Sequence, residues 1–220
     1  MSWWWVVVTF ALATALPNLI VFSISTEAAF RFLNLIYPNI QDPTPFLKNK
    51  TPITVHIYLN AAALIIGAFQ FKSLGYNHKL FGYLYTVCLV VGSVGAVNYA
   101  FSRDFGTDGG FAAQFSFLWM AIASVSPCLI GAYEIVINKD ILSHRQWMIR
   151  SYACLFGSGF LFRLFANIYL PFAPSNDRYP AWIAMIWMSW VMPLMMVEVY
   201  INSLNKQLYN QLYMQKTKNK

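Results

Sequence analysis

Six apolar runs in this chain are each long enough to cross a lipid bilayer, and they leave little sequence for anything else. They cover approximately residues 3–24, 53–71, 80–101, 112–137, 147–170 and 181–203. A helix of about 20 mostly apolar residues crosses the roughly 30 Å hydrocarbon core, whereas a closed barrel needs an alternation of polar and apolar residues that these runs lack. The sequence therefore predicts an all-α polytopic membrane protein, a bundle of about six transmembrane helices.

The composition and the distribution of charge agree with this class. Hydrophobic residues make up 58% of the chain and charged residues only 10%, against about 45–50% and 25% in soluble domains. One side of the spans carries nine Lys and Arg against three Asp and Glu, and the other carries six against five, which together give the net charge of +7. Since positive loops face the cytoplasm, both termini are expected inside, and the basic pI reflects topology rather than nucleic-acid binding.

The chain is expected to divide into three segments. Residues 1–52 hold the first transmembrane helix and a loop segment, in which Thr26 to Tyr37 has the pattern of an interfacial helix. Residues 53–205 form a five-helix membrane core, and residues 206–220 form a basic polar tail. The lipid bilayer is the predicted surrounding, either a bacterial plasma membrane or the mitochondrial inner or another organelle membrane.

Polar and small residues share one face of the second span and one face of the third. In the second span they are His56, Asn60, Ala63, Gly67 and Gln70; in the third they are His78, Gly82, Tyr85, Leu89, Gly92, Ala96 and Tyr99. Steps of three and four residues place each set on one side of a helix, and small residues let helices in membranes approach closely. Both faces are therefore expected to pack against other helices.

Two similar strings open two of the predicted helices on the inner side, Asn77-His78-Lys79 and Ser143-His144-Arg145. Asn and Ser are favoured as N-caps, and Ser143 starts a capping-box pattern that predicts a helix beginning at His144. Two imidazoles at one depth could ligate one metal, the iron of a haem b, with propionate partners among nearby cations: Lys79, Arg145 and Arg150. They could equally join a transition-metal site with Glu134 or Glu198, or simply hydrogen-bond locally while the cations reach the headgroups.

A second candidate site lies toward the outer side, where His56 and Arg163 fall inside their spans. Ionisable groups in a membrane are costly and tend to face the bundle interior. A substrate or quinone pocket is one interpretation, lined by His56, Asn60, Arg163, Asn98 and Gln114. A buried hydrogen-bond network that fixes helix packing is the other.

These motifs resemble those of an uncharacterised membrane family, domain of unknown function 2306 (DUF2306). The matching pieces are His56-Ile57, Gly67 to Phe71, His78-Lys79, Gly82 to Tyr85, Gly110-Phe111, His144 to Ala153 and Arg163-Leu164. The chain departs from the usual pattern at three positions: Lys79 where Arg is common, Ala68 where Pro is common and Asn60 where Gly is often seen. The resemblance implies a histidine-bearing helical bundle and supplies no established activity.

The leading hypothesis for function is a redox-linked membrane protein that binds haem or quinone between its helices. The alternatives are a non-catalytic subunit of a larger membrane complex, with other membrane subunits as partners, and a binder or transporter of an anionic lipid or small metabolite. No catalytic residue can be assigned from the sequence, so enzymatic activity is left open.

Overall fold

A computed structural model of the chain describes residues 3–24, 50–71, 76–102, 110–169, 172 and 178–218. These residues form the following elements: α1 (Trp3–Ile24), α4 (Lys50–Gln70), α5 (Tyr76–Phe101), α6 (Gly110–Tyr133), η1 (Glu134–Asn138), α7 (Ile141–Phe156), η2 (Gly157–Leu161), α8 (Phe162–Tyr169) and α9 (Arg178–Lys218). The two η elements are π-helical turns. The predicted all-α bundle is confirmed within the described ranges, while the interfacial helix expected at residues 26–37 lies outside them.

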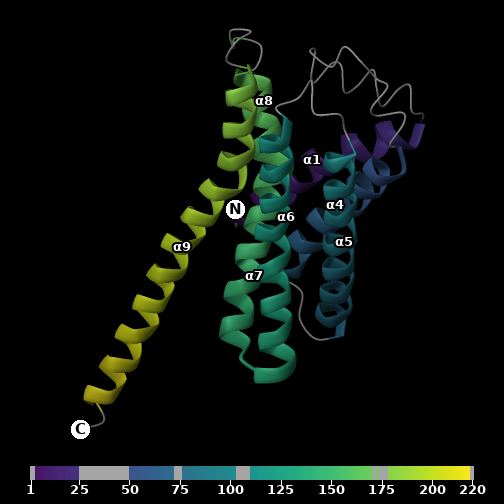
Figure 1. The fold of residues 1–220 in the computed structure, drawn as a ribbon. Coiled ribbons are helices and arrows are strands. Elements are labelled where there is room, and N and C mark those ends of the chain that lie inside the picture. The colour runs from purple at the N-terminus through teal and green to yellow at the C-terminus, as the bar shows by residue number, and fades with distance from the viewer. Residues whose placement is uncertain are drawn as a thin grey trace.

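Several elements join into longer rods (Figure 1). The turn η1 extends α6, and α7, η2 and α8 form one rod that runs from residue 141 to 169. This rod is central, because α6 and α9 both pack along it and α4 touches it. Helix α1 crosses the bundle obliquely and packs mainly on α4, whereas the far end of the 41-residue helix α9 leans away from the other helices.

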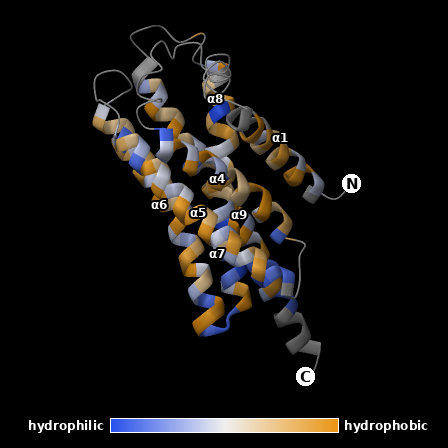
Figure 2. Cartoon of the chain, turned by 90° about the vertical axis from the view of Figure 1, so that its right-hand side faces the viewer, coloured by the Kyte–Doolittle hydropathy of each residue, from blue (hydrophilic) through white to orange (hydrophobic). Residues whose placement is uncertain are grey.

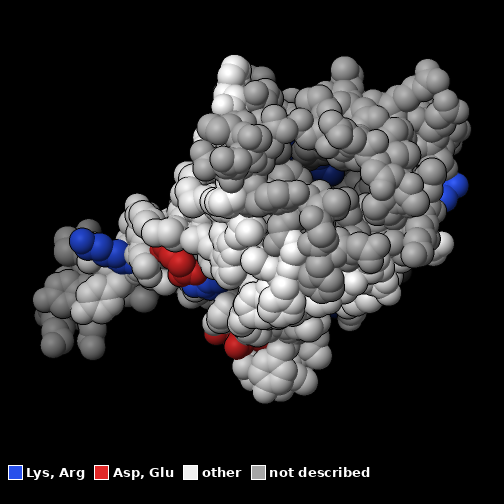
Figure 3. Space-filling model, turned by 45° about the horizontal axis from the view of Figure 1, so that its top comes forward, with Lys and Arg blue, Asp and Glu red and all other residues white. Residues whose placement is uncertain are grey.

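Within the described residues, four helices are long and apolar enough to cross a membrane: Lys50–Gln70, Asn77–Phe101, Gly110–Asn138 and Pro180–Gln211. Large apolar side chains cover their outward faces, among them Val94 with 63% of its surface exposed and Met195 with 65%. Figure 2 shows hydrophobic colour along the middle of the helices, and Figure 3 shows few charged side chains among the described residues of the face in view. These outward faces suit lipid rather than water.

The rod made of α7, η2 and α8 is the predicted fifth span, yet it is less apolar than the four helices above. Its central position explains this difference. Ser151 and Tyr152 are buried between neighbouring helices, and Arg150 pairs with Glu198 of α9. A helix surrounded by protein can carry polar groups that a lipid-facing helix cannot.

The predicted small-residue faces of α4 and α5 do meet one another. Asn60 lies against Gly92, where an added Cβ would collide with the amide. At Gly67 an added Cβ would lie 2.6 Å from the Tyr152 ring and 2.9 Å from the Tyr85 ring. The glycines are therefore required at these two crossings because partner side chains fill the space.

The turn η2 is the place where α9 approaches the central rod most closely. A Cβ on Gly157 would overlap the Ser189 carbonyl oxygen and lie 2.7 Å from Pro193 Cγ. Pro193 has no N–H, so the Ser189 carbonyl lacks the usual helical donor four residues later. The bare backbone of Gly157 lets this carbonyl pack directly against the rod.

Candidate functional sites at the two ends of the bundle

The two candidate sites lie at opposite ends of the bundle. We call the end with the turn between α6 and α7 the His144 end, and the end where α4 begins the His56 end. In Figure 1 the His144 end is at the bottom and the His56 end is at the top.

Asp140 caps α7, so the prediction that this helix begins at His144 behind a Ser143 cap is wrong. The carboxylate of Asp140 accepts the N–H of Leu142 at 2.9 Å, the N–H of Ser143 at 3.0 Å and the Ser143 hydroxyl at 2.8 Å. These donors, Ser143 first, hold the pKa of Asp140 below its usual range. The chain can turn back sharply because Lys139 adopts a left-handed backbone with φ of 57°.

The early start of the helix moves His144 one turn inside α7, and His78 is likewise the third residue of α5 rather than the residue after a cap. Their ring centroids are 6.3 Å apart, with the two ring planes nearly perpendicular at 82°. The predicted approach of these two histidines, which come from different helices, is therefore present in the fold.

The hydrogen bond on the other side of the His144 ring determines its tautomer. His144 Nδ1 lies 2.7 Å from the backbone oxygen of Gly131 in α6. A carbonyl oxygen only accepts, so Nδ1 carries the proton, and Nε2 of the neutral ring keeps its lone pair. Metal-binding histidines are oriented in the same way in many proteins.

Two polar atoms at the histidine pair are buried and have no hydrogen-bond partner in the part of the chain that the structure describes. They are His78 Nδ1 and Gln70 Oε1, while the other end of that amide, Nε2, donates to the His78 backbone oxygen at 2.9 Å. One turn along α5, a Cβ on Gly82 would lie 3.6 Å from Gln70 Nε2, which is an ordinary van der Waals contact. The pair thus adjoins polar atoms that have no partner among the described residues, and a glycine that lies against Gln70.

A buried hydroxyl pair separates the His144 end from the middle of the bundle. Tyr85 and Ser151 lie seven residues after His78 and His144 on the same two helices, and their oxygens are 2.9 Å apart. Ser151 donates its proton to the Ser124 carbonyl at 2.8 Å, so Tyr85 must donate to Ser151. Tyr85 is 1% exposed and Ser151 0%, so both hydroxyl groups lie in the interior of the bundle.

The predicted cationic partners of the histidine pair are not all available to it. Lys79 and Arg145 are exposed next to the two histidines in sequence. Arg150 instead pairs with both carboxylate oxygens of Glu198 in α9, and its Cζ lies 4.6 Å from the centre of the Trp147 ring. The structure therefore assigns Arg150 to the α7–α9 contact and not to the histidines.

At the His56 end, the histidine contacts helix α5 and its own helix. His56 Nδ1 lies 3.2 Å from the Gly92 backbone oxygen and 2.8 Å from Asn60 Nδ2. Asn60 Oδ1 is buried, and none of the described residues is a hydrogen-bond partner for it. The sequence placed His56 and Asn60 in one site, and the fold brings them together.

The other three residues predicted for that site are less closely associated. Arg163 is half-buried in α8 and donates from Nη1 to the Gly159 backbone oxygen in η2. Gln114 is buried near the start of α6, with 5% of its surface exposed. Asn98 is exposed, so it does not line an interior pocket with His56.

Some residues that shape the two ends were missed at the level of sequence. Asp140 could have been recognised as the cap from the sequence, because Asp is a favoured N-cap residue and Asp140 lies three residues before Ser143. The pairing of Arg150 with Glu198 could not have been recognised from a local pattern, because the two residues are 48 positions apart.

Within the described ranges, no group of three or more His, Cys, Asp or Glu residues could hold a metal ion.

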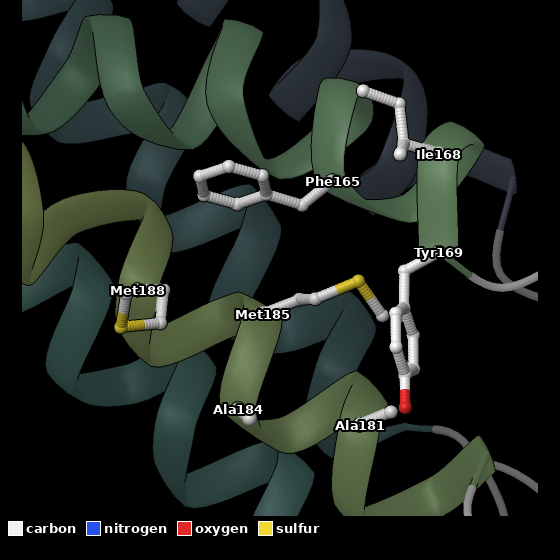
Figure 4. Close-up of a pocket in the computed structure, with 7 residues that line it drawn as sticks. All are labelled: Phe165, Ile168, Tyr169, Ala181, Ala184, Met185 and Met188. Atoms are coloured by element: carbon white, nitrogen blue, oxygen red, sulfur yellow. The ribbon is translucent and has the colours of Figure 1, made fainter. Parts of the chain in front are cut away.

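A second feature of the His56 end is an apolar pocket between α8 and α9 (Figure 4). It has a volume of about 430 Å³ and is lined by Phe165, Ile168, Tyr169, Ala181, Ala184, Met185 and Met188. Among these residues, Tyr169 carries a side-chain oxygen, its hydroxyl. Phe165 lies two positions after Arg163 in α8. Residues two positions apart face different sides of a helix, so the pocket and Arg163 lie on different sides of α8.

The fold and the two polar ends define a polytopic α-helical membrane protein. Residues 53–201 match the family described as predicted membrane protein (DUF2306), and the chain belongs to this family. The match extends beyond the motifs of the predicted resemblance, from α4 into the second half of α9. Neither a curated protein nor a solved structure matches the chain significantly.

Proposed function

We propose that this protein is a redox-linked membrane protein in which His78 and His144 hold one haem iron. The observation that carries the proposal is the 6.3 Å separation of the two rings. Metal–nitrogen distances of about 2.0–2.1 Å, added to the ring dimensions, would allow two imidazoles at about this separation to hold one ion. Two histidines are sufficient protein ligands, because the macrocycle supplies the remaining ones.

The residues around the pair suit such a group. The Gly131 carbonyl holds the His144 ring with its Nε2 lone pair available. His78 Nδ1 and Gln70 Oε1 are buried and have no hydrogen-bond partner among the described residues, which costs free energy that a bound group with water or polar substituents can recover. Gly82 lies on the His78 face of α5, where a Cβ would make an ordinary contact with Gln70 Nε2.

The protein's own groups have separate roles in this proposal. His78 and His144 bind the iron, and Lys79 and Arg145, exposed beside them, balance the propionate charges. The Tyr85–Ser151 hydrogen bond joins α5 to α7, the two helices that carry the histidines. A bound haem supplies one-electron transfer, with a potential that depends on its axial ligands and on nearby charge.

The visible spectrum of the purified protein tests this proposal. Protein expressed with ample haem should absorb in the Soret region, and His78→Ala and His144→Ala should each remove that absorbance while the bundle stays folded. His56→Ala is the matched control, because it removes the third histidine at the opposite end and should leave the spectrum unchanged. A colourless, iron-free wild-type protein would refute the proposal.

The two flanking cations give a finer test. Lys79→Gln and Arg145→Gln should shift the midpoint potential without removing the absorbance, because a propionate partner changes local charge but donates no ligand. Arg150→Gln is the control, since its guanidinium is held by Glu198. A larger shift for Arg150→Gln than for the other two would contradict the assignment.

A further inference from the structure

One ring nitrogen of His56 has two hydrogen-bond partners of opposite character. Nδ1 lies 3.2 Å from the Gly92 carbonyl oxygen, which only accepts, and 2.8 Å from Asn60 Nδ2, which only donates. With a proton on Nδ1 the ring bonds to Gly92, and without that proton it bonds to Asn60. Either neutral tautomer therefore keeps one hydrogen bond at Nδ1.

The other ring nitrogen, Nε2, has the opposite protonation state to Nδ1 in each neutral tautomer. When Nδ1 donates to Gly92, Nε2 is an acceptor; when Nδ1 accepts from Asn60, Nε2 carries a proton and is a donor. His144 provides the contrast within the same chain. Its Nδ1 hydrogen bond is to the Gly131 carbonyl, which fixes one tautomer.

We propose that His56 binds the headgroup of a lipid-soluble quinone at the His56 end, and that exchange between its two tautomers lets Nε2 bind both the oxidised and the reduced form. A quinone carbonyl only accepts a hydrogen bond, whereas the hydroxyl of the reduced form also donates one. Asn60 is a positioning residue, because it makes the donor state of Nε2 available. The choice of a quinone rests on the proposed redox function, which requires a partner that carries electrons and protons within the membrane.

The surroundings of His56 favour a ligand of this kind. His56 and Asn60 lie inside a helix that is apolar and long enough to cross a membrane, so a ligand dissolved in the bilayer can approach them. Helix α8, which carries Arg163, lies at the same end of the bundle (Figure 1), and a guanidinium can donate to a second ligand oxygen. Asn60 Oδ1 is buried and has no hydrogen-bond partner among the described residues, so helix packing there leaves this group unsatisfied.

Titration of the purified protein with decylubiquinone and with decylubiquinol, followed by tryptophan fluorescence, tests the proposal. In Asn60→Leu the remaining Nδ1 partner is the Gly92 carbonyl, so Nε2 is an acceptor only. Loss of one hydrogen bond should weaken binding of the oxidised form about 3- to 10-fold, while binding of the reduced form changes less than about 2-fold. His56→Ala should weaken both forms, and His144→Ala, the fixed-tautomer control, should weaken neither.

Unchanged binding in His56→Ala, or equal losses of both forms in Asn60→Leu with an unaltered melting temperature, would overturn the proposal. If Asn60→Leu does not fold, ¹⁵N spectra of histidine-labelled wild-type protein replace it. The His56 Nε2 resonance should move between the acceptor and donor ranges when the oxidised ligand replaces the reduced one. A resonance that stays in one range with both ligands refutes tautomer exchange.

The same titrations in His78→Ala separate this proposal from the haem proposal. Quinone binding should be retained there, although the haem should be lost. A colourless wild-type protein that binds both ligand forms removes the haem and keeps the quinone site. A haem-containing protein that binds neither form removes the quinone site alone.

Discussion

The contact between Gly157 and α9 allows a single methyl group to report on the packing of the whole helix. In Gly157→Ala the new Cβ overlaps the Ser189 carbonyl oxygen and lies 2.7 Å from Pro193 Cγ and 3.1 Å from the Ser189 carbonyl carbon. A flexible side chain could turn aside, but a backbone carbonyl moves only if α9 moves. The substitution should therefore push α9 away from the central rod.

The magnitude follows from two opposing terms. Overpacking costs typically about 1–3 kcal/mol, and a backbone neighbour favours the upper half of that range. Replacing Gly by Ala within a helix returns about 1 kcal/mol. The net loss should be about 1–2 kcal/mol, which lowers the melting temperature by about 2–8 °C for a chain of this size.

Gly159→Ala is a matched control two residues along the same π-helical turn. Its new Cβ would lie 3.6 Å from Leu64 Cδ2 and 3.8 Å from Thr14 Cγ2, which are ordinary van der Waals contacts. This variant should keep the stabilisation of up to about 1 kcal/mol that Ala gives over Gly within a helix, so it should melt slightly above wild type. Thermal melts of the detergent-solubilised protein, followed by tryptophan fluorescence, measure both variants.

The outcome of the test depends on which of the two variants has the higher melting temperature. If Gly157→Ala melts at or above Gly159→Ala, the close approach of α9 at Gly157 is refuted. Pro193→Ala provides an internal check, because it removes the Cγ contact and restores an N–H to the Ser189 carbonyl. Added to Gly157→Ala, it should recover part of the lost stability.

Three further predictions concern single positions. Arg163→Leu should lower the free energy of unfolding by about 1–3 kcal/mol, because the Gly159 carbonyl loses the guanidinium donor, and Arg163→Lys should recover only part of the loss in thermal melts. Asp140→Ala should lower the melting temperature at pH 7; because the folded pKa of Asp140 is lowered, this difference should persist above the ordinary aspartate pKa of about 3.9 and disappear as pH falls through the folded value. In a cysteine-free background, a cysteine at Thr107 should react with an impermeant reagent from outside and one at Ile141 should not; the reverse pattern would invert the predicted topology.

Several parts of the fold could be predicted from local sequence because the membrane imposes them. Apolar length alone located helices at 3–24, 53–71 and 80–101, close to the observed α1, α4 and α5. The spacing of small residues in α4 and α5 indicated their packing faces, and Gly67 and Gly92 do lie at close crossings.

The candidate sites were predictable in part, and the limits have a physical cause. His78 and His144 were expected at one depth because their helices start from the same side, and that expectation holds. The hydrogen bonds that give each histidine its chemistry come from backbone carbonyls of other helices, Gly131 and Gly92. A carbonyl is present at every residue, so no sequence pattern marks the one that meets an imidazole.

The sequence by itself determined that this protein is a helical membrane bundle with histidines near both ends, because a bilayer requires long apolar helices and tolerates few ionisable groups. Tertiary structure alone decided how those groups are used. It paired Arg150 with Glu198 and left His78 and His144 with one another. Which side chains become partners depends on the rotation and crossing of whole helices. Packing over many residues, including the π-helical turns and the Gly157–α9 contact, sets that arrangement, whereas local sequence preference does not.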